Sequence, residues 1–304
     1  MVDNAVTLGA RHRWTAAHLA ALIAANLALA LGPWLVRLAD TGPVAAGFWR
    51  LGLALPILFI LSSREAAAQR RVRGAALALV IGAGVFFALD LASWHVGIKA
   101  TKLGNASLFG NSGSVILMAW GLIAAHRPPR LLELGAIAAA LGGAGLLMSG
   151  SLEIGRANLV GDLFCALAGI FYALYILMLN SVRARLGQFS VLAFSTAAGV
   201  PVLLLIAMLL GETIIPHNWT PLIVLAISSQ LVGQGFLIYS LRHFPPLVIG
   251  LALLTQPAIS AGAGWLAFGE TLTIIDGIGM LLLAAALVLA RLGDGLKARD
   301  PCRG

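Results

Sequence analysis

The sequence is poor in charge and in cysteine. Asp, Glu, Lys and Arg make up only 11% of its 304 residues, whereas hydrophobic residues make up 60%. Soluble domains carry roughly 25% charged residues, so this deficit excludes an ordinary water-facing surface and indicates lipid as the solvent. The two cysteines, Cys165 in an apolar run and Cys302 in the polar tail, do not predict a disulfide and provide no metal-ligand spacing.

The motifs of common enzyme classes are also missing. There is no GxxxxGK[ST] phosphate loop, no HExxH, no GxSxG and no histidine–cysteine cluster. Lone serines and histidines within apolar runs do not form a triad, so we expect no enzymatic activity, no metal and no cofactor. The net charge of +8 does not indicate a nucleic-acid partner, because the basic residues lie between apolar runs and form no continuous face.

Long apolar runs are what the sequence has in abundance. Each is close to the roughly 20 residues that an α-helix needs to cross the hydrocarbon core of a bilayer. Short polar connections force neighbouring spans to run antiparallel. The first run follows Arg11 and Arg13, as in a signal peptide, but it has the length of a span and we expect it to be retained. The sequence therefore predicts an all-α integral membrane protein with ten transmembrane helices, near 15–37, 43–62, 74–98, 103–125, 130–150, 158–180, 189–211, 219–240, 246–267 and 272–292.

The basic residues predict the orientation of these spans. With the N-terminus inside, fifteen Arg and Lys residues fall in cytoplasmic segments, and only four, Arg37, Lys99, Lys102 and Arg156, fall on the opposite side. This bias predicts that both termini are cytoplasmic. A missed or extra helix would scramble the alternation, so the count also favours ten spans, with bacterial inner membrane as the expected location.

The two halves of the chain repeat one layout. A shift of 144 residues places Asp90 on Gln234, and likewise His95 on Tyr239. Five helices per half is an odd number, so the second copy must enter the membrane upside-down. This predicts an inverted-topology repeat of residues 1–152 and 153–304, an arrangement typical of secondary transporters whose substrate site lies near mid-membrane.

The last two helices resemble a known family. The run LLTQPAISAGAGWLAFGETLTIIDGIGMLLLAAALVLA, with Pro257 in mid-helix, Gly269-Glu270 after the ninth span and Gly279 in the tenth, is similar to the closing helices of the EamA-type drug/metabolite transporter superfamily. Arg50 after Phe48-Trp49 also resembles that family's pattern. The resemblance covers the whole chain in its 5+5 arrangement, and within the superfamily it is closest to the YddG-like aromatic amino-acid exporters.

This resemblance implies a function but not every residue role. It implies a secondary transporter that exports small organic metabolites, amino acids and aromatic ones especially, by alternating access. The alternatives are export of another metabolite or drug-like compound, or a passive channel. The first half departs from the pattern, because Gly113 stands where Pro257 would map and His126 where Glu270 would. The expected partners are a small-molecule substrate and membrane lipid.

Asp90 is the sharpest candidate for a substrate-binding residue. It lies about eight residues from the outer end of its expected helix, roughly 12 Å deep, with Phe86, Phe87 and Trp94 on the same helical face. An aspartate at mid-span costs about 3 kcal/mol on insertion scales, so such groups usually face a cavity or a partner. A structural hydrogen bond is the alternative.

Two glutamines and six aromatic or imidazole side chains are further candidates. Gln230 and Gln234 lie one turn apart on the eighth helix, and we expect Gln234 to face Asp90 across a central cavity; interhelical packing is the alternative. We expect Trp94, His95 and Tyr239 to lie closer to the outer surface, where they stack on a ligand, bind a carboxylate or form an interfacial belt. Trp34, Tyr172 and Tyr175 close the same space or serve as belt and packing residues.

The remaining candidates lie on the second, fourth and ninth helices. Pro257 frees a backbone carbonyl, so it predicts a loosened helix next to Asn111, Ser112 and Gln256 that coordinates an amino or hydroxyl group, or else a packing kink. An unpaired arginine in mid-span is costly, so Arg50 is expected to snorkel, to pair with an acid such as Asp40 or to bond helix ends. We expect Arg50 and Pro257 to have structural or gating roles.

Overall fold

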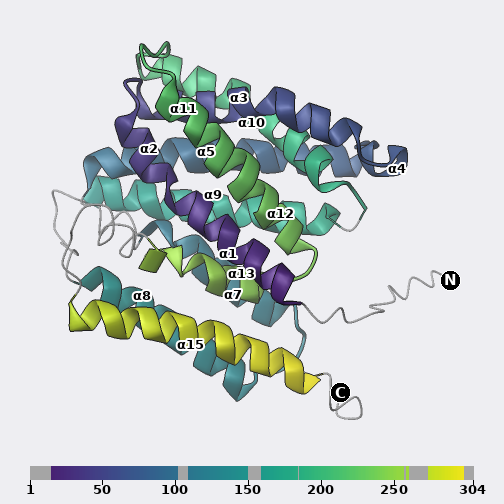
Figure 1. Cartoon of the computed structure of the whole chain (residues 1–304), viewed down its shortest axis with the longest axis vertical. Helices are drawn as coiled ribbons and strands as arrows, with labels where there is room; N and C mark the ends of the chain where they lie inside the picture. The colour runs from purple at the N-terminus through teal and green to yellow at the C-terminus, as the bar shows by residue number, and fades with distance from the viewer. Residues whose placement is uncertain are drawn as a thin grey trace.

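The structure, a computed structural model, is built of helices (Figure 1). It describes residues 15–101, 109–149, 159–183, 185–256, 258–259 and 273–297, and none of these lies in a β-strand. The helices are α1 (Ala16–Ala30), α2 (Gly32–Leu38), α3 (Pro43–Ser63), α4 (Ala67–Arg70), α5 (Ala75–Ala100), α7 (Ser112–Ile123), α8 (Leu131–Ser149), α9 (Leu159–Val182), α10 (Gln188–Leu209), α11 (Thr220–Leu225), α12 (Gly235–Leu241), α13 (Pro246–Leu253) and α15 (Ile274–Lys297), with the π-helical segment η1 (Ala226–Gln234) between α11 and α12.

Six helical runs of the described residues are long and apolar enough to cross a membrane. They are Ala16–Val36, Pro43–Ser63, Ala75–Ala100, Leu159–Val182, Gln188–Leu209 and Thr220–Leu241, and Ser112–Ile123, Leu131–Leu146 and Ile274–Ala290 are shorter apolar helices. Each of these runs overlaps one of the ranges expected from the sequence. The bundle is apolar outside as well as inside: Leu209 is 77% exposed and Leu281 is 72% exposed. Helices that are apolar all round belong in lipid or in a core, so these surfaces face acyl chains.

The helices pack in pairs drawn from the two halves of the chain. The most extensive contacts join α5 to α9, α8 to α15, α3 to α10 and α5 to α10, and α7 also packs on α13. The first helix, α1, packs along η1 and α12. In Figure 1, α8 and α15 lie together at the bottom of the view, below the rest of the bundle.

The connections between helices gather at two opposite ends of the bundle. At the end we name the basic end, Arg183 donates a hydrogen bond to the carbonyl of Phe244 (3.2 Å) and Arg242 donates one to the carbonyl of Leu186. At the other end, which we name the Asp40 end, the Asp40 carboxylate accepts hydrogen bonds from the backbone N–H groups of His217 and Asn218 (2.8 and 3.1 Å).

Those two hydrogen bonds affect the ionisation of Asp40. Desolvation acts to raise the pKa of Asp40, but the bonds from Asn218 and His217 outweigh it and hold the pKa below its usual value. Asp40 therefore ties the α2–α3 connection to the α10–α11 connection as a carboxylate. It does not pair with Arg50, which was one of the alternatives for that arginine.

Two glutamates cap the long helices α3 and α10. Glu212, beyond the end of α10, accepts a hydrogen bond from the N–H of Ala45 in the first turn of α3 (2.8 Å). Glu65, just beyond the end of α3, accepts bonds from the N–H groups of Phe189 and Ser190 in the first turn of α10 (2.8 and 3.0 Å). The first N–H groups of a helix have no partner within it, and a carboxylate also complements the positive end of the helix dipole. Each helix is thus capped by an acid that follows the other.

Candidate functional site

Six side chains from four elements meet inside the bundle, and we name this set the central cluster. Arg50 comes from α3, Phe87 and Asp90 from α5, Tyr172 and Tyr175 from α9, and Gln234 from the end of η1. The helix α5 ends at Ala100, ten residues beyond Asp90. At 1.5 Å per residue, Asp90 therefore lies about 15 Å from that end, slightly deeper than the sequence predicts.

Aromatic rings connect the members of the central cluster. The Arg50 guanidinium carbon lies 5.5 Å from the centroid of the Phe87 ring, a cation–π distance. Phe87 stacks on Tyr175, with centroids 4.6 Å apart and planes 18° apart. The Tyr175 hydroxyl donates a hydrogen bond to the side-chain oxygen of Gln234 (3.1 Å). Asp90 on α5 and Gln234 on η1 therefore lie near the same group of aromatic rings.

The two charges of the central cluster interact without neutralising each other at contact. Arg50 and Asp90 interact electrostatically and both interact with the two tyrosines, yet no direct ion pair joins these two described residues. Arg50 is only 7% exposed, and its Nε has no hydrogen-bond partner among the described groups. Asp90 is half-buried and accepts no hydrogen bond from the part of the chain that the structure describes. Buried charges are normally paired. The Arg50 and Asp90 groups therefore have hydrogen-bonding capacity that a ligand or water would satisfy.

Gln230 lies one turn before Gln234 and belongs to the same π-helical segment. Its amide nitrogen donates a hydrogen bond to the Thr196 hydroxyl on α10 (2.9 Å), while its buried Oε1 has no partner among the described groups. π-Helical turns are rare and are frequent at functional sites. The sequence analysis identified Gln230 but neither Thr196 nor the π-helical turn, because apolar periodicity does not distinguish a π-helix from an α-helix.

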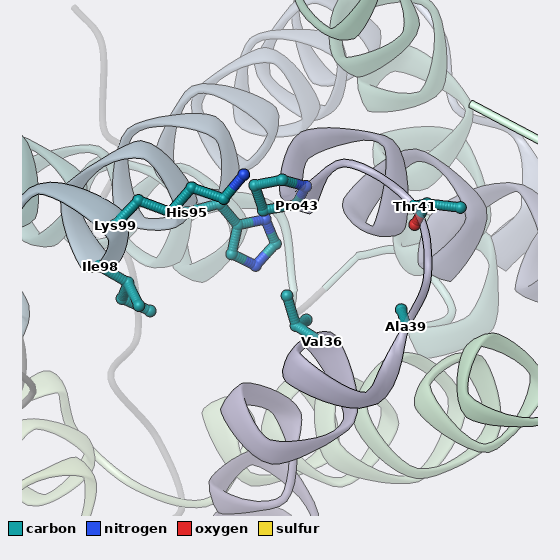
Figure 2. Close-up of a pocket in the computed structure, with 7 residues that line it drawn as sticks. All are labelled: Val36, Ala39, Thr41, Pro43, His95, Ile98 and Lys99. Atoms are coloured by element: carbon teal, nitrogen blue, oxygen red, sulfur yellow. The ribbon is translucent and has the colours of Figure 1, made fainter. Parts of the chain in front are cut away.

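Trp94 and His95 lie beyond the central cluster, toward the Asp40 end. Their rings are 5.4 Å apart; His95 is 2% exposed and its Nδ1 has no hydrogen-bond partner among the described groups. The His95 ring lies against Gly47 of α3 and borders a pocket of about 200 Å³ next to Pro43 and Lys99 (Figure 2). Trp94 is half-buried and lies close to Gly110, before the start of α7.

The expectation that Tyr239 lies with His95 near the outer surface is wrong. The Tyr239 ring packs on His243 (4.5 Å) and meets the edge of His18 (6.0 Å), at the start of α1 and the end of α12. His95 instead lies beside Pro43, at the other end of the bundle. The physical reason is the direction of the chain: α5 and α12 run oppositely, so matched residues near their ends fall at opposite ends.

The polar residues on the fourth and ninth expected helices hold helices together. The Ser112 hydroxyl donates a hydrogen bond to the carbonyl of Ala166 on α9 (3.1 Å). The Gln256 amide donates to Asn26 on α1 (3.3 Å), and Asn26 in turn donates to the carbonyl of Leu22 (2.9 Å). These two side chains therefore bond neighbouring helices.

Three other candidates lie apart from the central cluster or outside the described chain. Asn111 is half-buried and stands at the N-cap position of α7. Trp34 on α2 is 47% exposed, so it lies on the outer surface of the bundle rather than in an enclosed site. Pro257 lies outside the described residues.

Comparisons with known proteins agree with a transporter. Residues 159–292 match the EamA-like transporter family. An uncharacterized transporter of Archaeoglobus fulgidus is 23% identical over 84% of this chain and 89% of its own length. The threonine/homoserine exporter RhtA of Salmonella typhimurium (strain SL1344) is 26% identical over 84% and 83%, and RhtA of Escherichia coli K12 is 27% identical over 68% and 67%.

A solved structure shares the fold. One crystal structure superposes with a TM-score of 0.77 over 93% of this chain and 99% of the other, at 14% identity, which concerns the fold alone. The relatives named above are transporters and not enzymes, and the apolar helices of this chain have the length of membrane spans. Residues 159–292 therefore match the EamA-like transporter family, and the chain is a multi-pass inner-membrane transporter.

Proposed function

We propose that the chain exports amino acids from the cytoplasm through a site formed by the central cluster. The observation that carries this proposal is the open pair of Arg50 and Asp90, two buried or half-buried charges that interact but do not touch. A zwitterion complements such a pair, because its carboxylate bonds a guanidinium and its ammonium bonds a carboxylate. A purely anionic or cationic ligand would satisfy only one of the two.

The side chain of the substrate would lie against the aromatic part of the central cluster. The rings of Phe87, Tyr172 and Tyr175 form a surface suited to an aromatic side chain, which supports the preference expected from the sequence. The RhtA relatives support a second class, small hydroxy amino acids, for which the tyrosine hydroxyls and Gln234 offer hydrogen bonds. Both classes share the zwitterionic head group.

Alternating access requires two halves that move about the site, and the helix contacts support an inverted repeat of residues 1–152 and 153–304. When each helix is exchanged for its mate about 144 residues away, the contact of α5 with α9 becomes that of η1 with α1. The contacts α3–α10 and α8–α15 each join a helix to its own mate. A two-fold axis within the membrane produces this pattern.

Individual hydrogen bonds follow the same shift. The carbonyls of Leu22 and Ala166, 144 residues apart, each accept a side-chain bond, from Asn26 and from Ser112. Asn26 is bonded by Gln256, which is the mate of Ser112. The glutamate caps on α3 and α10 also involve mates, since Ala45 and Phe189 are 144 residues apart. These details support ten spans arranged as two copies of five.

Transport by the purified chain in liposomes tests the proposal. We expect saturable efflux of labelled amino acids, stimulated by unlabelled amino acid on the other side, because an alternating-access carrier exchanges substrates whereas a channel does not. Asp90→Asn should lower the flux at least about tenfold, since loss of a buried charged contact costs more than about 1.4 kcal/mol. Trp94→Ala should also lower the flux, because it removes an aromatic ring next to His95.

Arg64→Gln serves as the matched control, because Arg64 is exposed at the end of α3, away from the central cluster. All variants must elute as folded protein in detergent at the same position as the parent chain. Wild-type flux in Asp90→Asn would contradict the assignment of the central cluster, and flux that does not saturate would favour a channel.

A further inference from the structure

A pocket lies between the central cluster and the Asp40 end, and we name it the outer pocket. It has a volume of about 200 Å³ and is lined by Val36, Ala39, Thr41, Pro43, His95, Ile98 and Lys99. Figure 2 shows the His95 ring pointing into the space that Val36 borders, with Thr41 on the far side. The end of α2, the α2–α3 connection and the last turns of α5 supply this lining.

The polar groups of the outer pocket are an imidazole and a hydroxyl, each able to donate one hydrogen bond, and one cation, and two of them lack a partner. The buried Nδ1 of His95 and the buried hydroxyl of Thr41 have no hydrogen-bond partner among the described groups. Lys99 adds an exposed ammonium group. The remaining lining residues are apolar, and the nearby carboxylate of Asp40 is held by the backbone of His217 and Asn218. Unpartnered donors beside a cation are suited to an oxyanion.

A series of basic groups links the central cluster to the outer pocket. His95 interacts with Arg50 on its inner side and with Lys99 on its outer side. His95 also lies against Gly47, which is one turn from Arg50 along α3. Three basic groups therefore follow one another from the central cluster toward the Asp40 end, the end that holds few basic residues and that the proposed topology places outside.

From this arrangement we propose that the outer pocket is a carboxylate-binding subsite on the export path. The outer pocket receives the carboxylate of the amino acid after Arg50 releases that carboxylate. The inference therefore rests on the proposed function and adds a second binding position on the export path. The aliphatic part of the substrate would lie against Val36, Ile98 and Pro43.

Cysteine labelling tests the charge preference without relying on transport. Val36→Cys is placed in a chain in which Cys165→Ala and Cys302→Ser remove the native thiols. The thiol is modified from the Asp40 side with a sulfonate-bearing methanethiosulfonate and with its trimethylammonium counterpart. A cleft of one charge sign raises the local concentration of counter-ions, so we expect the anionic reagent to react about tenfold faster relative to its rate with free thiol. Lys99→Gln should bring the two rates close together, whereas Arg64→Gln at the basic end should leave their ratio unchanged.

Protection separates a substrate carboxylate from an inorganic anion. We expect an external amino acid to slow the labelling several-fold, and its neutral amide or an equal concentration of chloride to leave the rate unchanged. Equal rates for the two reagents, or equal protection by chloride, would overturn the outer pocket as a carboxylate subsite. A chain that shows the charge preference but transports no amino acid would instead overturn the proposed function, so the two failures are distinct.

Discussion

Buried polar residues in this bundle fall into two groups. Most are satisfied by a neighbour: the Ser62 and Ser190 hydroxyls bond each other (2.8 Å), and Asn26 donates to the backbone of its own helix. Arg50 and His95, in contrast, each bury a nitrogen without a described partner, and such a partner is also lacking for the side-chain oxygens of Thr41, Asn180, Gln230 and Ser240. Unsatisfied buried groups cost stability, and two of them, on His95 and Thr41, line the outer pocket, which favours a ligand as their missing partner.

Tyr175→Phe separates the polar role of this residue from its packing role. The substitution keeps the stack on Phe87 but removes the hydrogen bond to Gln234, which is worth about 1 kcal/mol within a membrane bundle. We expect the half-saturating amino-acid concentration to rise several-fold in liposome flux, because Gln234 is no longer oriented. Tyr239→Phe is the matched control, since its ring lies at the basic end. An unchanged half-saturating concentration in Tyr175→Phe would contradict a role for this hydroxyl in the site.

At the scale of residues, the free-energy cost of placing a charged group in mid-span was the most useful basis for prediction from the sequence. A carboxylate in mid-span is expensive, and that argument alone identified Asp90, which the structure brings together with Tyr172 and Tyr175. The same cost applied to Arg50, but its neighbours could not be predicted, because they come from helices far apart in the chain. Ser112 and Gln256 were also conspicuous as polar residues in apolar runs, yet their bonds to Ala166 and Asn26 are interhelical.

At the scale of elements, hydropathy predicted where helices occur but not where they change form. The span Thr220–Leu241 contains the π-helical segment Ala226–Gln234, which carries both glutamines. The first span is divided at Leu31, before Gly32 and a proline that suits the first turn of a new helix. Such changes depend on neighbouring side chains, here Thr196 on Gln230 and Gly32 against Ser229, and a single sequence does not contain that information.

The reciprocal caps on α3 and α10 were not predicted, although the sequence holds a signal for them. Glu65 and Glu212 are two of only twelve acidic residues, and each follows the end of a long apolar run. Their positions in sequence do not reveal that each bonds the first turn of the mate helix. The function of these caps is to fix the α3–α10 pair at both ends.

We expect Glu65→Gln and Glu212→Gln each to lower the unfolding temperature in detergent. Loss of a charged cap costs about 1 kcal/mol, which is roughly 2 °C for a chain of this size. The caps lie at opposite ends of the bundle, so the double variant should show the sum of the two shifts. Differential scanning fluorimetry measures this, with the exposed neighbour Arg64→Gln as the control. A double variant no less stable than either single variant would contradict independent caps.

For the whole molecule, the two ends differ in how many basic residues they hold, although Glu65 caps α10 at the basic end. Arg183 and Arg242 bond backbone carbonyls at the basic end, whereas Asp40 and Glu212 accept bonds from backbone N–H groups at the Asp40 end. The positive-inside rule assigns the basic end to the cytoplasm. The proposed topology would then put the His18, Tyr239 and His243 rings at the inner entrance and the outer pocket at the exit.

This orientation predicts which cysteines a membrane-impermeant maleimide reaches in intact cells. Asn218→Cys at the Asp40 end should be labelled without permeabilisation, because it lies in the connection that Asp40 holds outside. Gln69→Cys, whose backbone carbonyl bonds Gly187 at the basic end, should be labelled only after permeabilisation. Both side chains are at exposed or loop positions, so accessibility and not burial decides the result. The reverse pattern would place the outer pocket in the cytoplasm, where it would receive substrate instead of releasing it, and labelling of both positions in intact cells would contradict opposite ends.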